Sequence, residues 1–154
     1  MESTGTGLSL QLLALAAYVD TEVHAALERD GFGDLRTSHG YVFQHLLVAP
    51  QTISALAQRL GMTKQGASKA VIELEGLGYV RRTRGSDGRV RLVEMTERGR
   101  AGVEAARRAR DALDRRLMAM MGDRANPFRI TLDLLAADSG AVETMLARRL
   151  RPPT

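Results

Sequence analysis

Apolar residues recur along most of the chain at the three- and four-residue spacing of amphipathic helices. This spacing predicts long helices over 8–29 and about 97–121, and a shorter helix over about 37–48. After Gly122, the pair Asn126-Pro127 is typical of a cap followed by a first helical residue, and predicts a helix that continues to Ala137. A further apolar pattern over 142–150 leaves open whether 127–150 form one helix or two.

Residues 52–96 show a different order of patterns. Thr52 and Thr63 can each cap a helix, and the second of these helices places its apolar residues at helical period on an inward face: Ala67, Ala70, Val71, Leu74 and Leu77. After Gly78, apolar and polar residues alternate with a period of two. This alternation predicts strands over 79–84 and 90–95, joined by a turn at 85–88. Two helices followed by a hairpin indicate a winged helix-turn-helix.

Polar side chains near the start of the second helix are candidates for contacts with base edges in the major groove of DNA. They are Thr63, Lys64, Gln65, Ser68 and Lys69. The amide of Gln65 can bind adenine through two hydrogen bonds, while the two lysines can reach guanine or phosphate. On the hairpin, Arg82, Arg84, Asp87 and Arg89 are candidates for contacts with phosphates or the minor groove. Asp87 either orients Arg89 or is an ordinary turn residue.

The segment that carries these motifs resembles the MarR family of transcriptional regulators. The resemblance rests on Thr63–Lys69, Gly78–Arg82, Asp87-Gly88-Arg89 and Met95–Gly99. The wing lacks the Pro-x-Asp-Arg-Arg form common in that family, and Met95 stands where leucine is usual. The resemblance implies a homodimer on a pseudo-palindromic operator, acting as a repressor that a small ligand releases. It also implies a ligand pocket beside the helix predicted over about 37–48, with His39 and Tyr41 as candidate lining residues. For His39, a partly buried structural histidine is the alternative.

The chain is therefore expected to be mainly α (α+β), with one domain over 1–154. Within it we expect a DNA-binding lobe over 37–96 and dimerisation helices over 8–34 and 97–150. The composition is 44% hydrophobic but 4% aromatic, which favours leucine- and alanine-rich helices that need a partner for full burial.

Positive charge concentrates on the predicted DNA-binding part. Residues 51–91 carry eight basic and three acidic side chains, whereas residues 1–50 carry two and six. This is the charge distribution expected of a protein that binds phosphates, although basic runs can also be solvated surface.

Other chemistry finds little support in the sequence. The chain has no cysteine, its three histidines lack the spacing of a metal pair, and no enzyme motif or cofactor motif is present. We expect no metal, no cofactor and no catalytic residue. The apolar run near the N-terminus is too short for a membrane span, so a cytoplasmic protein is expected. A winged helix that binds RNA or docks a protein remains the alternative function.

Overall fold

The computed structural model describes residues 7–86, 88–141 and 145, and within them the chain forms helices and one small sheet. The elements follow in the order α1 (Leu8–Arg29), α2 (Thr37–Leu46), α3 (Ile53–Leu60), α4 (Lys64–Gly76), β1 (Val80–Arg84), β2 (Arg91–Met95), α5 (Glu97–Met121), the 3₁₀ turn η1 (Gly122–Arg124) and α6 (Ala125–Asp138). The mainly helical fold with a two-stranded wing is as predicted from the sequence.

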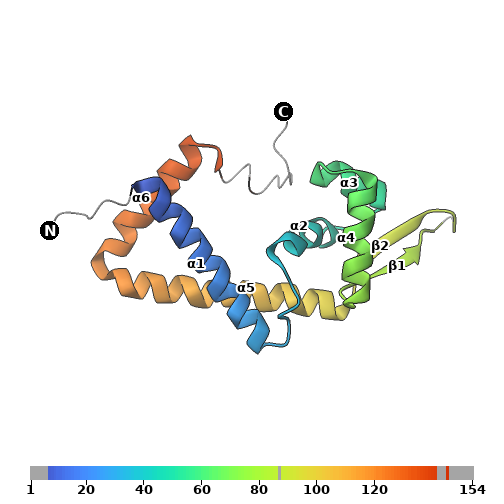
Figure 1. Ribbon diagram of the computed structural model, residues 1–154, viewed down its shortest axis with the longest axis horizontal. Coiled ribbons are helices and arrows are strands. Elements are labelled where there is room, and N and C mark those ends of the chain that lie inside the picture. The colour runs from blue at the N-terminus through green and yellow to red at the C-terminus, as the bar shows by residue number, and fades with distance from the viewer. Residues whose placement is uncertain (1–6, 87, 142–144, 146–154) are drawn as a thin grey trace.

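Helices α2, α3 and α4 and the β1–β2 hairpin form a lobe at one end of the molecule, and α1 and α6 lie at the other end (Figure 1). The core of this lobe consists of side chains from all of its elements: Leu46, Leu56, Leu60, Val71, Leu74, Tyr79, Val80 and Val93. Gln51, just before α3, exchanges two backbone hydrogen bonds with Val93 of 2.7 and 3.0 Å. The wing is thereby attached to the start of α3 as well as to α4.

Three helices of the lobe and its border begin at a threonine that caps them. The hydroxyls of Thr52, Thr63 and Thr96 each accept a hydrogen bond of 3.1 Å from the backbone N–H three residues later. Each cap satisfies one of the N–H groups that a helix start leaves without a partner. The first turns of α3, α4 and α5 are fixed in this way, as the sequence predicts for α3 and α4.

Helix α5 runs along the whole molecule and connects the two ends (Figure 1). Its first turns pack so closely against the lobe that side chains are excluded there. A Cβ atom on Gly99 would lie 2.2 Å from the carbonyl oxygen of Tyr79, and one on Gly102 would lie 2.8 Å from Cδ1 of Leu35. The two glycines therefore allow the helix backbone to rest directly on Tyr79, just before β1, and on the α1–α2 connection.

At the end away from the wing, α1 and α6 expose large apolar side chains. Between 39 and 67% of each is accessible: Leu8, Leu10, Leu12, Leu13, Leu15, Phe128, Ile130, Leu132, Leu134 and Leu135. Within α1, Leu27 alone is buried in the single chain. Two amphipathic helices thus leave most of their apolar surface uncovered by the described chain.

The helix start predicted at Asn126-Pro127 is wrong. Gly122 has a positive φ of 55° and begins the 3₁₀ turn, which continues directly into α6 at Ala125. Asn126 and Pro127 are therefore its second and third residues, where a proline is tolerated because the first N–H groups need no helical partner. Helix α2 also ends two residues before the predicted Val48. The helix expected over 142–150 lies outside the described residues, except for Met145.

None of the helices in the described part of the chain is both long and apolar enough to cross a membrane.

Candidate nucleic-acid interface

One face of α4 is polar and exposed because the opposite face forms the core. Ala67, Val71 and Leu74 are buried, and residues about 180° around the helix from them point away from the protein. Gln65 and Lys69 are exposed there, and Ser68 is half-buried at the edge of this face. Lys64 lies on the side of Val71 but is exposed as the first residue of the helix. Thr63 is also exposed, and its hydroxyl is engaged in the helix cap. Three of the five predicted candidates thus share the outer face of α4, and Lys64 and Thr63 lie at its N-terminal end.

The arginines of the wing divide into two groups by their partners. Arg81 donates a hydrogen bond of 2.6 Å to Glu94 across the hairpin, and Nε of Arg82 lies 3.3 Å from the carboxylate of Glu75 at the end of α4. These two arginines hold the wing together and attach it to α4. Arg84 and Arg91 have no carboxylate partner among the described residues.

Arg84 and Arg91 are direct cross-strand partners at the outer end of the hairpin. Partners in register project to the same face with Cβ atoms about 5 Å apart, so two guanidinium groups meet on one side of the wing. Arg91 was not among the predicted site residues. Pairing the two predicted strands about the turn at 85–88 places Arg89 or Val90 opposite Arg84, so only the observed strand register identifies Arg91.

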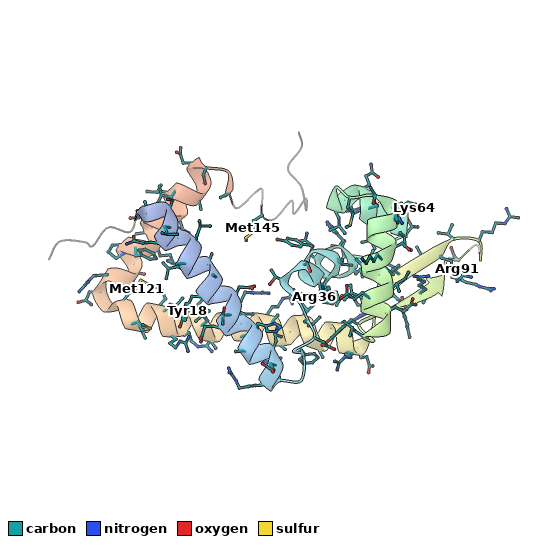
Figure 2. All side chains as sticks on the ribbon, viewed as in Figure 1. Tyr18, Arg36, Lys64, Arg91, Met121 and Met145 are labelled. Carbon is teal, nitrogen blue, oxygen red and sulfur yellow. The ribbon has the colours of Figure 1, made fainter. Side chains whose placement is uncertain are left out.

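The turn of the wing is closed by backbone hydrogen bonds from Gly85 to Val90 of 2.7 Å and from Gly88 to Gly85 of 2.9 Å. Gly88 has a φ of 69°, which a residue with a side chain rarely adopts. Arg89 follows it and is exposed. Asp87 lies outside the described residues. Figure 2 shows Arg91 on the hairpin and Lys64 at the start of α4 at the same end of the molecule, far from Tyr18 and Met121.

A polar cluster beneath the lobe joins the α1–α2 connection, the residue before β1 and α5. The Tyr79 hydroxyl donates a hydrogen bond to Asp34, and Arg98 approaches both groups, at 3.1 Å from the hydroxyl and 3.3 Å from the carboxylate. The Arg98 guanidinium also lies over the Tyr79 and Phe32 rings, 4.7 and 5.5 Å from their centroids. We call Asp34, Tyr79 and Arg98 the elbow cluster.

The ionisation of the elbow cluster follows from its contacts. Burial and the bond to Asp34 raise the pKa of Tyr79 to about 12, so its hydroxyl remains a donor. Partial burial raises the pKa of Asp34, but the bond from Tyr79 and the charge of Arg98 outweigh that effect and lower it below its ordinary value. The cluster therefore keeps one negative and one positive charge at neutral pH.

His39, a candidate ligand residue, is buried at the start of α2. Its Nδ1 accepts a 3.1 Å hydrogen bond from the backbone N–H of Arg36, and its Nε2 lies 3.7 Å from the carboxylate of Glu73 on α4. Glu73 also pairs with the Arg36 side chain. Burial lowers the pKa of His39, and the Glu73 charge only partly opposes this. His39 thus links α4 to the start of α2.

A cleft of about 220 Å³ lies elsewhere, between α1 and α5. It is lined by Glu22, Ala26, Arg29, Ala109, Ala112, Leu113 and Arg116. The predicted ligand residues His39 and Tyr41 do not line this cleft. Within the residues that the structure describes, no three histidine, aspartate or glutamate side chains are placed to hold a metal ion.

Helices α3 and α4 are both capped, and the hairpin is attached to α4. Together with the polar outer surface of α4 and the hairpin, this arrangement defines a winged helix-turn-helix protein. The model of the MarR family matches residues 34–89, which cover α2, α3, α4, β1 and the turn of the wing. The winged-helix lobe of this chain is a MarR-family lobe, and the chain as a whole has the fold of MarR-family transcriptional regulators.

Solved structures of similar fold cover nearly the whole chain. YusO of Bacillus subtilis aligns with a TM-score of 0.68 at 19% identity, over 85% of this chain and 92% of its own. A mutant of Staphylococcus aureus MepR, bound to an oligodeoxyribonucleotide, aligns with a TM-score of 0.63 at 18% identity, over 89% and 99%. A MarR-family protein of Mycobacterium tuberculosis in complex with salicylic acid aligns with a TM-score of 0.56 at 27% identity, over 86% and 98%. No curated protein sequence matches the chain.

Proposed function

We propose that this protein regulates transcription by binding a specific sequence of double-stranded DNA through α4 and the wing. The observation that carries the proposal is the Arg84–Arg91 pair. Like charges directly opposite one another destabilise a hairpin, and here no carboxylate in the described chain offsets them. A DNA phosphate placed between the two guanidinium groups would remove their repulsion. The oligodeoxyribonucleotide bound to MepR, which shares the fold, supports the same assignment.

The acting form is proposed to be a homodimer, with the dimerisation region formed by residues 8–34 and 97–150 and the DNA-binding lobe by 37–96. The exposed apolar side chains of α1 and α6 support this assembly. A soluble monomer rarely exposes a large contiguous apolar patch, and the same surface on a second copy would cover it. Two lobes in one dimer would bind two half-sites of a pseudo-palindromic operator.

We further propose that a small ligand controls DNA binding and that the protein acts as a repressor. The salicylic acid complex of the M. tuberculosis relative supports ligand binding on this fold. The α1–α5 cleft lies between the helices of the dimerisation region and carries Arg29 and Arg116 on its wall. A ligand there would act by favouring one arrangement of the two lobes over another.

The test is a titration of duplexes by fluorescence anisotropy over a series of salt concentrations. The native chain should bind one duplex, selected from a random library, more tightly than a scrambled duplex. Arg84→Ala and Arg91→Ala should each reduce the slope of log affinity against log salt by about one on both duplexes. Arg110→Ala, which removes an exposed arginine from the middle of α5, is the matched control and should leave the slope unchanged.

Gln65→Ala separates base recognition from phosphate binding in the same assay. It should cost about 1–3 kcal/mol on the selected duplex and leave binding to the scrambled duplex unchanged. If RNA of the same sequence competes as well as DNA, or if no duplex is preferred, the winged helix is an RNA-binding or protein-docking module instead.

A further inference from the structure

Ile72 is a large apolar residue on the exposed face of α4. More than half of it, 57%, is accessible to solvent, although the face around it is polar. Gln65, Lys69, Ile72 and Gly76 follow one another at spacings of four, three and four residues, so they form one stripe along the helix. The sequence pattern assigns Ile72 neither to the core nor to the predicted site.

The fold does not use this side chain. It projects about 140° around the helix axis from Ala67 and 100° from Val71, which are both buried against the lobe. Isolated exposed apolar residues are common on protein surfaces, so the exposure of Ile72 by itself assigns nothing. Ile72 lies between Lys69 and Gly76 on the exposed stripe of α4. In the proposed function this stripe faces the DNA, so Ile72 would lie against it.

The surroundings of Ile72 favour contact with a base over contact with phosphate. Ser68 and Lys69 precede it by one turn and can reach polar groups. Gly76 follows it by one turn, and nothing lies within 4 Å of the place where its Cβ would be. A base edge can therefore approach the helix backbone closely at Gly76, beside the Ile72 side chain. A branched aliphatic side chain can offer such an edge an apolar contact and no hydrogen bond.

One base carries an apolar group in the major groove. Thymine presents its C5-methyl group there, while cytosine, adenine and guanine present hydrogen-bonding groups alone. We propose that Ile72 packs against a thymine methyl group and selects a T·A pair at one position of each half-site. This inference rests on the proposed function and adds an apolar specificity residue to its polar ones.

Replacing thymine by deoxyuridine tests the proposal, because it removes the methyl group and leaves the base-pairing groups unchanged. The full-length chain is titrated with the selected duplex and with duplexes that carry uracil at one thymine position of both half-sites. At one of these positions, uracil should weaken binding by about fourfold per half-site, the value expected for one buried methyl group. At that same position, a duplex with a 5-methylcytosine·guanine pair should bind more tightly than a duplex with a cytosine·guanine pair.

Variants of the protein assign the effect to the side chain. Ile72→Ala should bind the thymine duplex more weakly and show no further loss with uracil, whereas Ile72→Val should keep part of the difference. Val48→Ala is the matched control, because Val48 is 83% exposed on the same lobe but lies after α2. It should show the full loss on uracil DNA. Equal thermal melting of all variants checks that each is folded.

The outcomes separate the two proposals. If the native chain prefers no duplex, the proposed function fails, and the role of Ile72 fails with it. If the native chain binds its selected duplex but no uracil substitution matters, or if Ile72→Ala retains the loss, DNA binding stands and the assignment of Ile72 is overturned.

Discussion

At the scale of single residues, Tyr79 connects the lobe to α5 most closely. Its side chain is fully buried, its ring lies under the Arg98 guanidinium, and its hydroxyl is the donor to Asp34. Tyr79→Phe keeps the ring and removes the hydroxyl, which leaves a partly buried carboxylate without that donor. We expect a loss of about 1–3 kcal/mol in the free energy of unfolding, measured by chemical denaturation.

Tyr18→Phe is the matched control for this change. The Tyr18 hydroxyl accepts a 2.6 Å hydrogen bond from Arg116 at the surface, where water can replace it. Its removal should change stability by less than about 0.5 kcal/mol. Equal losses from the two variants would show that the elbow cluster contributes no more than a surface hydrogen bond.

His39 makes the stability of the protein depend on pH. The pKa of His39 in the fold is lower than its ordinary value of 6.5, so the unfolded chain takes up the proton first as the pH falls. The contribution of neutral His39 is fully present above about 6.5. It declines as the pH falls from there through the folded pKa, with a slope of at most about 1.4 kcal/mol per pH unit.

His39→Gln tests this dependence, because a glutamine at the third helical position can accept the same bond from the Arg36 N–H without titrating. Denaturation between pH 7.5 and 5 should show a smaller fall in stability than in the native chain. His24→Gln removes an exposed histidine from α1 and should preserve the native pH profile. A native profile in the His39 variant would contradict the assignment.

At the scale of elements, the close contact of α5 with the α4–β1 connection depends on the absence of a side chain at Gly99. Gly99→Ala would place a Cβ against the Tyr79 carbonyl and force the helix away from the strand. The expected cost is about 1–3 kcal/mol or more, measured as the shift of the denaturation midpoint. Gly76→Ala, at the end of α4 with open space around it, should instead stabilise by about 0.5 kcal/mol.

The elements that the sequence predicts well are those defined by neighbouring residues. The caps at Thr52, Thr63 and Thr96 involve partners three residues away, and the helix and strand periods are equally local. The start of α6 is not predicted correctly, because a 3₁₀ turn begins at Gly122 and continues directly into the helix at Ala125, so Asn126 is not a cap. The connection from α5 to α6 determines this helix start, and the local capping preference of Asn126 does not.

The parts of the site that the sequence does not predict depend on distant partners. The hydrogen bond from Tyr79 to Asp34 spans 45 residues, and no local pattern indicates it. Arg82 is a candidate for contacts with DNA, and its Nε lies beside Glu75, a neighbour that only the packing of the wing on α4 brings near. Arg91 became a candidate only when the strand register was known.

At the scale of the whole molecule, the uncovered apolar face of α1 and α6 predicts self-association. Leu15→Glu would place a charge on this face, 50% of the leucine being accessible in the single chain. We expect monomers, or an association weakened by at least tenfold, in sedimentation equilibrium, because a buried unpaired carboxylate is costly. Val48→Glu, at an even more exposed residue of the lobe, should leave the native assembly unchanged.

The length of α5 gives the elbow cluster an influence out of proportion to its size. The helix has 25 residues, which corresponds to about 37 Å at 1.5 Å per residue. A tilt of about 5° at the cluster moves the far end of such a rod by about 3 Å, close to the 3.4 Å rise of one base pair. A rotation of this size about Tyr79, Asp34 and Arg98 would therefore displace the two ends of the molecule relative to each other by about the length of one base-pair step.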